Sequence, residues 1–249
     1  MAIVIFQHAS NCGPGRLGLC LRDHGFKVDL RRLDLPKEDS YHRGRSIGIP
    51  ADFDNVHGVI SLGGPQNVGD DVPWMKPEMA FLAEAHRRQL PVMGICLGHQ
   101  MVAQALGGAV GPMVTPEVGF HRVSLTTAGQ IETVLGGVAW DGPQLQSHGQ
   151  EVKTLPAGAT LLATSKGCKN QAFKAGVRTY GFQYHFECDR TMCESFLGGD
   201  DSLVRWCRTA GGDLGQSIDE AFPLFNRMAD RLCVNLAAFM FPEAIRLSA

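Results

Sequence analysis

Residues 91–100 read Pro-Val-Met-Gly-Ile-Cys-Leu-Gly-His-Gln. The short apolar run at 91–95 predicts a strand that is buried on both faces, as strands of parallel sheets are. The stretch 98–106 predicts a helix, and it ends at two glycines, where a helix C-terminus is expected. A buried strand that turns directly into a helix is the repeating unit of α/β folds.

The turn between these two elements carries a candidate nucleophile. Gly94, Cys96 and Gly98 form the pattern G-x-C-x-G, a nucleophile elbow with cysteine in place of serine. Because the turn is sharp, the residues two positions before and after the nucleophile must lack a Cβ atom. The elbow would present the thiol at the carboxyl end of the sheet and at a helix N-terminus, whose partial positive charge favours a thiolate. The amide of Leu97 would point to where an oxyanion forms. The alternative is a buried structural cysteine in a glycine-rich turn.

The alternation of strand and helix continues towards the N-terminus. Strands are predicted at residues 2–6, 27–33 and 56–62, and helices at 17–24 and 75–89. Strands that alternate with helices form a parallel sheet covered on both faces.

The second half of the chain has a different character. Short strands are predicted at residues 120–126, 144–147, 159–165, 170–175 and 179–185, and helices at 203–209 and 218–241. We therefore expect an α/β, flavodoxin-like fold: a mostly parallel sheet with helices on both faces, a small antiparallel extension and a helical C-terminal segment. Residues 1–190 would form the main domain, and residues 191–249 a helical extension packed on the same domain.

Composition excludes several classes of function. The 249 residues carry a formal net charge of −2, which disfavours a protein that binds nucleic acid by bulk electrostatics. No stretch approaches the roughly 20 apolar residues that span a bilayer, and the N-terminus does not resemble a signal peptide. Eight cysteines without a CxxC pair fit neither a disulfide scaffold nor a zinc ribbon. These features predict a cytoplasmic chain with reduced thiols, no membrane association and no metal site.

A second segment supplies a candidate base for the thiol. Residues 181–187 read Gly-Phe-Gln-Tyr-His-Phe-Glu, and in a strand His185 and Glu187 would point to the same face. A thiol near neutral pH needs a base, and the carboxylate could orient the imidazole. The H-x-E pair is also half of a zinc-deaminase signature, but the accompanying P-C-x-x-C is absent. A histidine satisfied within the core remains the alternative.

A third segment, Ser-Leu-Gly-Gly-Pro at residues 61–65, ends a predicted strand. Glycines there allow the backbone to approach a ligand closely, so this turn could supply a second oxyanion donor. A simple turn is the alternative.

Together, these segments resemble the class I (triad) glutamine amidotransferases. The matching motifs are Gly-Gly-Pro at 63–65, Gly-Ile-Cys-Leu-Gly-His-Gln at 94–100 and Gln-Tyr-His-Phe-Glu at 183–187. The resemblance implies the following site: Cys96 as nucleophile, His185 as acid and base, Glu187 as its orienter, Gly64 and Leu97 as oxyanion donors, and Gly63 and Gln100 at the bound glutamine. The family commonly has His-Pro-Glu where this chain has residues 185–187.

The resemblance implies an enzyme that hydrolyses the side-chain amide of glutamine through a Cys96 thioester. No ATP-binding signature occurs, so no cofactor is expected, and ammonia would pass to a separate synthetase partner. Length and the segment Gln-Ser-His-Gly at 146–149 favour the stand-alone, GMP-synthase-like subgroup. Three alternatives stay open: a γ-glutamyl peptidase with the same triad, a non-catalytic subunit that depends on its partner, and a DJ-1-like protein. Homo-oligomers are a further possibility.

Three features outside the motifs have competing interpretations. Residues 13–18 match G-x-G-x-x-G but lie too far from the first strand for a dinucleotide site, so a loop at the active-site rim is expected. Residues 231–241 are apolar around most of a helix and predict either packing on the sheet or a docking face. Any of four histidines near strand ends could line the pocket: His8, His99, His121 and His148.

Overall fold

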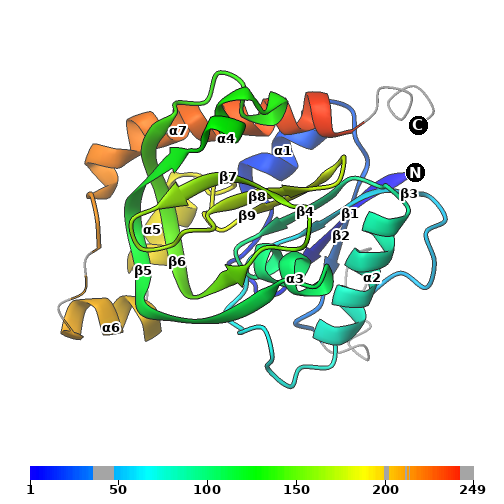
Figure 1. The fold of residues 1–249 in the computed structure, drawn as a ribbon, viewed down its shortest axis with the longest axis horizontal. Coiled ribbons are helices and arrows are strands. Elements are labelled where there is room, and N and C mark those ends of the chain that lie inside the picture. Colours follow the sequence, from blue (N-terminus) through cyan, green and yellow to red (C-terminus); the bar gives the residue numbers. More distant parts are fainter. Residues whose placement is uncertain (36–47, 199–201, 211, 213, 242–249) are drawn as a thin grey trace.

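A single nine-stranded sheet organises the molecule in the computed structural model, which describes residues 1–35, 48–198, 202–210, 212 and 214–241. The strand order is β2-β1-β3-β4-β9-β8-β7-β5-β6, and the first five strands run parallel (Figure 1). These five are β2 (Val28–Arg32), β1 (Ala2–Gln7), β3 (Val56–Ser61), β4 (Val92–Ile95) and β9 (Thr179–Phe182). The strand β4, which leads into the Cys96 elbow, lies between β3 and β9. The segments 63–65 and 183–187, which follow β3 and β9, therefore lie next to the elbow.

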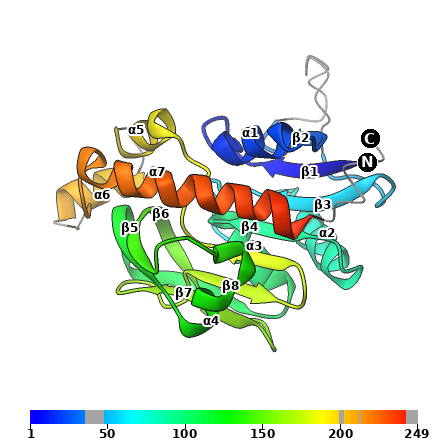
Figure 2. The ribbon, with the colours of Figure 1, turned by 90° about the horizontal axis from the view of Figure 1, so that it is seen from above.

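Helices cover both faces of this parallel half (Figure 2). Side chains of β1 alternate between two buried clusters: Ile3 and Ile5 pack on one face, Val4 and Phe6 on the other. The first cluster includes helices α1 (Gly15–Asp23) and α7 (Ile218–Asn235), and the second includes α2 (Met75–Arg87) and α3 (Leu97–Ala105). The α/β, flavodoxin-like prediction is confirmed.

The antiparallel extension is larger than the sequence predicted. It comprises β8 (Ala172–Ala175), β7 (Thr160–Ser165), β5 (Ala109–Leu125) and β6 (Asp141–Thr154). The short strands expected at 120–126 and 144–147 are parts of the long β5–β6 pair. Prolines and glycines inside both strands concealed their length. The β5 register shifts between Pro112 and Glu117, and Pro143 is tolerated because β6 is an edge strand.

Several helices differ from the sequence-based expectation. The predictions at 203–209 and 218–241 correspond to α6 (Ser202–Ala210) and to α7, which continues as one π-helical turn, Leu236–Met240. The short elements not predicted individually are α4 (Thr127–Ile131), the 3₁₀ turn Thr133–Leu135 and α5 (Arg190–Gly198). The proposed domain boundary near residue 190 stays a prediction.

The apolar C-terminal stretch 231–241 packs chiefly into the core. Leu232, Leu236 and Phe241 are buried against the sheet, whereas Phe239 is 59% exposed. All eight cysteines are free thiols. Within the described residues, none of the helices is both long enough and apolar enough to cross a membrane.

Candidate active site

The elbow holds Cys96 in a backbone conformation that L-amino acids rarely adopt. Its φ is +52° and its ψ is −106°, between the end of β4 and the start of α3. The flanking glycines are required sterically. A Cβ on Gly94 would lie 2.2 Å from the carbonyl oxygen of Gly98, and a Cβ on Gly98 would lie 2.0 Å from that of Ser61. The turn therefore has no room for a Cβ atom at Gly94 or Gly98, as the sequence predicts.

Gly98→Ala is expected to destabilise the protein by about 1–3 kcal/mol or more and to displace the elbow. The new methyl group would overlap the carbonyl oxygen of Ser61, which is part of the sheet backbone and has no room to move away. Thermal unfolding and accessibility of the Cys96 thiol to a reagent would measure both effects. Gly111→Ala is the matched control, since its Cβ would meet only the Lys153 side chain at 3.5 Å. Equal stability of the two variants would contradict the steric argument.

His185 and Glu187 form a buried pair. The His185 Nδ1 atom lies 2.7 Å from Glu187 Oε1, and both side chains are at most 3% exposed. The predicted strand over these residues is wrong: β9 ends at Phe182, and the pair lies in the turn that follows. The His185 amide N–H donates to the Leu145 carbonyl at 2.9 Å, which ties this turn to β6.

The environment of His185 favours its protonated form. Burial alone would lower the pKa of the imidazole, but the Glu187 carboxylate and the Cys96 sulfur outweigh burial and raise this pKa well above 6.5. The second ring nitrogen, Nε2, is buried without a hydrogen-bond partner. In the protonated ring this nitrogen carries a proton that it can give to a bound molecule.

The glycine-rich segment 13–18 supports the turn that carries His185 and Glu187. A Cβ on Gly15, whose φ is +45°, would lie 2.1 Å from the Glu187 carbonyl oxygen, which accepts from the Arg16 amide at 2.9 Å. The Arg16 guanidinium donates twice to the Cys188 carbonyl, at 3.1 and 2.8 Å. This segment begins α1 and holds residues 187–188. It was expected to form a rim loop, but the preceding residues Asn11 and Cys12 lie at the cavity instead.

The glycine turn after β3 lies against the His185 ring. A Cβ on Gly63 would be 2.7 Å from His185 Cε1 and 3.5 Å from the Cys96 Cβ, so both side chains flank this residue. The amide of Leu97 is the first of α3 and has no intrahelical acceptor. The amide of Gly64 likewise has no backbone acceptor among the described residues.

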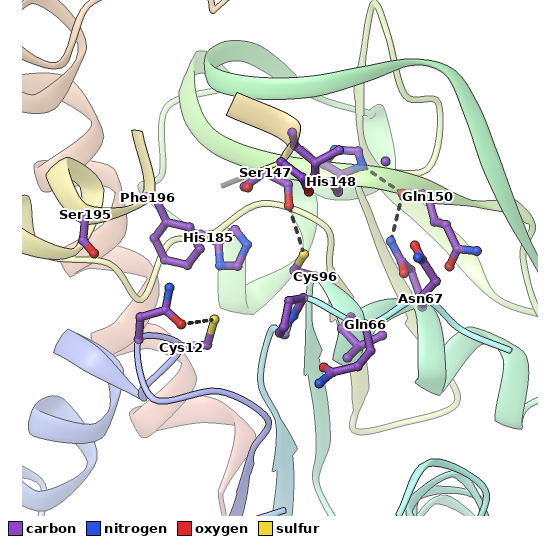
Figure 3. A pocket seen from close by; sticks show the side chains of 18 residues that line it. Cys12, Gln66, Asn67, Cys96, Ser147, His148, Gln150, His185, Ser195 and Phe196 are labelled. Carbon is purple, nitrogen blue, oxygen red and sulfur yellow. Dashed lines mark hydrogen bonds between the residues drawn. The ribbon is translucent and has the colours of Figure 1, made fainter. Parts of the chain in front are cut away.

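Cys96 and His185 line a cavity of about 400 Å³, together with Gly64, Leu97 and Gln100 (Figure 3). The Cys96 Sγ atom lies 3.7 Å from the Ser147 carbonyl oxygen. The Gln100 amide nitrogen donates to the Gln150 carbonyl at 2.8 Å. Gly63 is not among the lining residues, because the His185 ring covers it.

Of the four additional histidines, only His148 lines this cavity. Its Nε2 atom lies 3.2 Å from Glu117 Oε2, within a buried polar network between β5 and β6. His121 bonds the Val118 carbonyl at 2.9 Å. Burial lowers the pKa of His99 to about 3, so the ring beside the elbow is neutral. His8 lies on the opposite side of the glycine turn, completely buried.

Sequence reasoning missed much of the cavity wall. The residues it did not propose individually are Asn11, Cys12, Pro65, Gln66, Asn67, Ser147, Gly149, Gln150, Ser195, Phe196, Ser202 and Leu203. In the segment 146–149, the sequence predicts only His148 as a pocket residue. The last four residues belong to α5 and α6, and the Phe196 ring lies 4.9 Å from that of His185. No motif in the sequence indicates that these helices reach the cavity.

One group of described residues has donor atoms close enough together to hold a metal ion: His185, Glu187 and Cys188, within 4.8 Å of one another. Burial and the Glu187 charge raise the pKa of the Cys188 thiol well above 9.0, so it stays protonated. His185 Nδ1 and Glu187 Oε1 are already engaged with each other at 2.7 Å. The hydrogen-bonded pair accounts for this cluster.

The chain is similar to known glutamine amidotransferases and their relatives. A component of the glutamine-hydrolysing GMP synthase of Saccharolobus solfataricus is 32% identical over 146 residues, which cover 56% of this chain and 74% of that protein. The glutamine amidotransferase-like protein YfeJ of Salmonella typhimurium is 31% identical over 193 residues, which cover 75% and 76%. A glutamine amidotransferase structure from Methylobacillus flagellatus aligns with a TM-score of 0.74 at 25% identity, covering 96% of this chain and 93% of that one. The profile of class-I glutamine amidotransferases matches residues 17–196, so the chain belongs to this family.

Proposed function

We propose that the chain hydrolyses the side-chain amide of glutamine to glutamate and ammonia. The observation that carries the proposal is the strained Cys96 in one cavity with His185, whose Nδ1 atom is held by Glu187. The Cys96 thiolate attacks the amide carbon and forms a C–S bond, while the C=O electrons move onto oxygen. Collapse of this intermediate breaks the C–N bond, and protonated His185 gives its proton to the leaving ammonia.

The second half of the reaction uses the now neutral His185 as a base. It takes a proton from water, and the hydroxide adds to the thioester carbon. Breaking the C–S bond then releases the side-chain carboxylic acid, which loses its proton to solvent as glutamate, and regenerates the Cys96 thiolate beside protonated His185. Glu187 keeps Nδ1 protonated, so that Nε2 is the atom that exchanges protons with substrate and water.

The oxyanion formed in both steps would be stabilised by the amides of Gly64 and Leu97. Support comes from their place on the cavity wall and their lack of backbone acceptors among the described residues. Each such donor contributes about 2.7–4 kcal/mol to transition-state stabilisation in other hydrolases. Gln100 lies in the same cavity and would contact the bound glutamine.

We further propose that the ammonia serves a separate synthetase. Support comes from relatives in Saccharolobus solfataricus and Sulfolobus acidocaldarius, each named as one component of a glutamine-hydrolysing GMP synthase. A cytoplasmic location fits this proposal. A γ-glutamyl peptidase would use the same Cys96, His185 and Glu187 but needs no acceptor.

The test is glutamate release by the purified chain from glutamine and, in parallel, from γ-glutamyl peptides. Release that favours glutamine and disappears in Cys96→Ala supports the proposed function. Preference for the peptides would replace it with peptidase activity. If neither substrate is cleaved, labelling of Cys96 by a glutamine-like electrophile decides whether the isolated site is assembled, and absence of labelling contradicts a self-sufficient glutaminase.

A further inference from the structure

A buried cluster of three polar residues lies against the Gly63–Gly64 turn, on the side away from the cavity. His8 follows β1, Ser61 ends β3 and Glu78 lies in the first turn of α2. All three residues are completely buried. Glu78 Oε2 is 2.8 Å from His8 Nε2, and Glu78 Oε1 accepts from the Ser61 hydroxyl at 2.7 Å. The Trp74 ring stacks on His8 at 4.6 Å.

The contacts of His8 fix its protonation. Its Nδ1 atom lies 3.2 Å from the Gly63 carbonyl oxygen, which can only accept a hydrogen bond. Its Nε2 atom faces the Glu78 carboxylate, which also accepts when ionised. Both ring nitrogens therefore carry protons. Burial opposes this charge, but Glu78 and the backbone carbonyls of Gly63 and Leu62 together outweigh burial and raise the pKa of His8 above 6.5. The N-terminus of α2 favours the negative charge of Glu78.

The bond from His8 determines which way one peptide group faces. The C=O of Gly63 and the N–H of Gly64 belong to the same trans peptide and point in opposite directions. Because His8 holds the C=O on its own side, the N–H of Gly64 is directed away from His8. A Cβ added to Gly64 would lie 2.8 Å from the His8 Cβ, so His8 lies on one side of Gly64. The cavity lies on the other side.

We propose that His8 and Glu78 are positioning residues that orient the Gly63–Gly64 peptide so that its N–H serves as an oxyanion donor. The expected effect on kcat rests on the proposed function. The orientation of the Gly63–Gly64 peptide does not, because it can be observed in a structure without any activity. A buried charged pair costs desolvation energy that an apolar pair would avoid. Here the charge ensures that Nδ1 always donates, because a neutral ring could place its single proton on Nε2 instead.

Two substitutions of His8 separate its two contacts. In His8→Asn the side-chain amide nitrogen can reach the place of Nδ1 and still donate to the Gly63 carbonyl. In His8→Gln the amide reaches the place of Nε2, which keeps the Glu78 contact and leaves Gly63 unbonded. We expect kcat for glutamine to fall at least about tenfold in His8→Gln, towards the 10²–10³-fold of a lost oxyanion donor, with KM nearly unchanged. His8→Asn should recover most of kcat.

Crystal structures of the two variants provide a readout that does not depend on activity. The Gly63–Gly64 peptide should rotate in His8→Gln and keep its orientation in His8→Asn. If wild-type protein proves inactive on glutamine, the proposed function fails, while the peptide orientation still tests this inference. An unrotated peptide in folded His8→Gln, or equal kcat in both variants, would overturn it.

Glu78→Gln covers the case in which His8→Gln does not fold. It preserves the volume but removes the charge that keeps both His8 nitrogens protonated, and its amide can present either the nitrogen or the oxygen to His8 Nε2 while the other atom bonds the Ser61 hydroxyl. The ring can then adopt either neutral tautomer, so we expect a several-fold decrease in kcat with unchanged KM. An unchanged kcat in this variant would count against the positioning role.

Discussion

Cys96→Ala abolishes glutamate release: we expect kcat to fall by about 10⁴ to 10⁶-fold, the loss seen when a covalent nucleophile is removed from a triad. Alanine cannot form the thioester, so neither half-reaction has a route. The substitution should leave stability nearly unchanged, because the elbow is held by Gly94 and Gly98 and not by the thiol. Initial-rate assays and thermal unfolding measure the two effects.

Cys20→Ala is the matched control, because it also removes one thiol. Cys20 is a half-buried residue of α1 and does not line the cavity. It should retain wild-type turnover. A glutamine-like electrophile should add one equivalent of label to the wild type and to Cys20→Ala, and none to Cys96→Ala. Persistent activity in Cys96→Ala would refute the proposed mechanism outright.

The elbow was predictable because its constraints are local. The sharp turn leaves no room for a Cβ at Gly94 or Gly98, so the requirement appears directly as a pattern in the sequence. Alternation of strand and helix similarly determined the parallel half of the sheet. The pairing of His185 with Glu187 was expected from the spacing in a strand, yet a turn produces it. The spacing was informative although the assumed local structure was wrong.

Contacts between distant segments left no comparable signal. The His8–Glu78 pair joins residues 70 positions apart, and each residue alone is indistinguishable from an ordinary polar side chain. Phe196 on α5 reaches the His185 ring only through tertiary packing. The β5–β6 pair was underestimated because proline and glycine normally end strands, and only cross-strand pairing shows that these strands continue past them.

Glu187→Gln should lower kcat/KM for glutamine by about 10² to 10⁴-fold and move the alkaline limb of its pH profile to lower pH. The wild-type carboxylate is the largest of the groups that oppose the effect of burial, so the pKa of the His185 ring is lower without it. A larger fraction of the ring is then neutral at a given pH and has no proton for the leaving ammonia. Rates measured across the pH range would show the shift.

Glu194→Gln is the charge-matched control, because Glu194 is 53% exposed and, within the described part of the chain, its ion pair is with Arg190 on the same helix. This variant should keep the wild-type pH profile.

The stability of Glu187→Gln should change with pH as well. In the wild type, the raised pKa of His185 contributes stability that is complete below the unfolded value of about 6.5 and is lost as pH rises through the folded value. In Glu187→Gln the folded pKa of His185 is lower than in the wild type, so this stabilisation is smaller and is lost at a lower pH. If the free energy of unfolding changes with pH in the same way in both proteins, Glu187 does not control the charge of His185. The proton for the leaving ammonia would then have to come from another group.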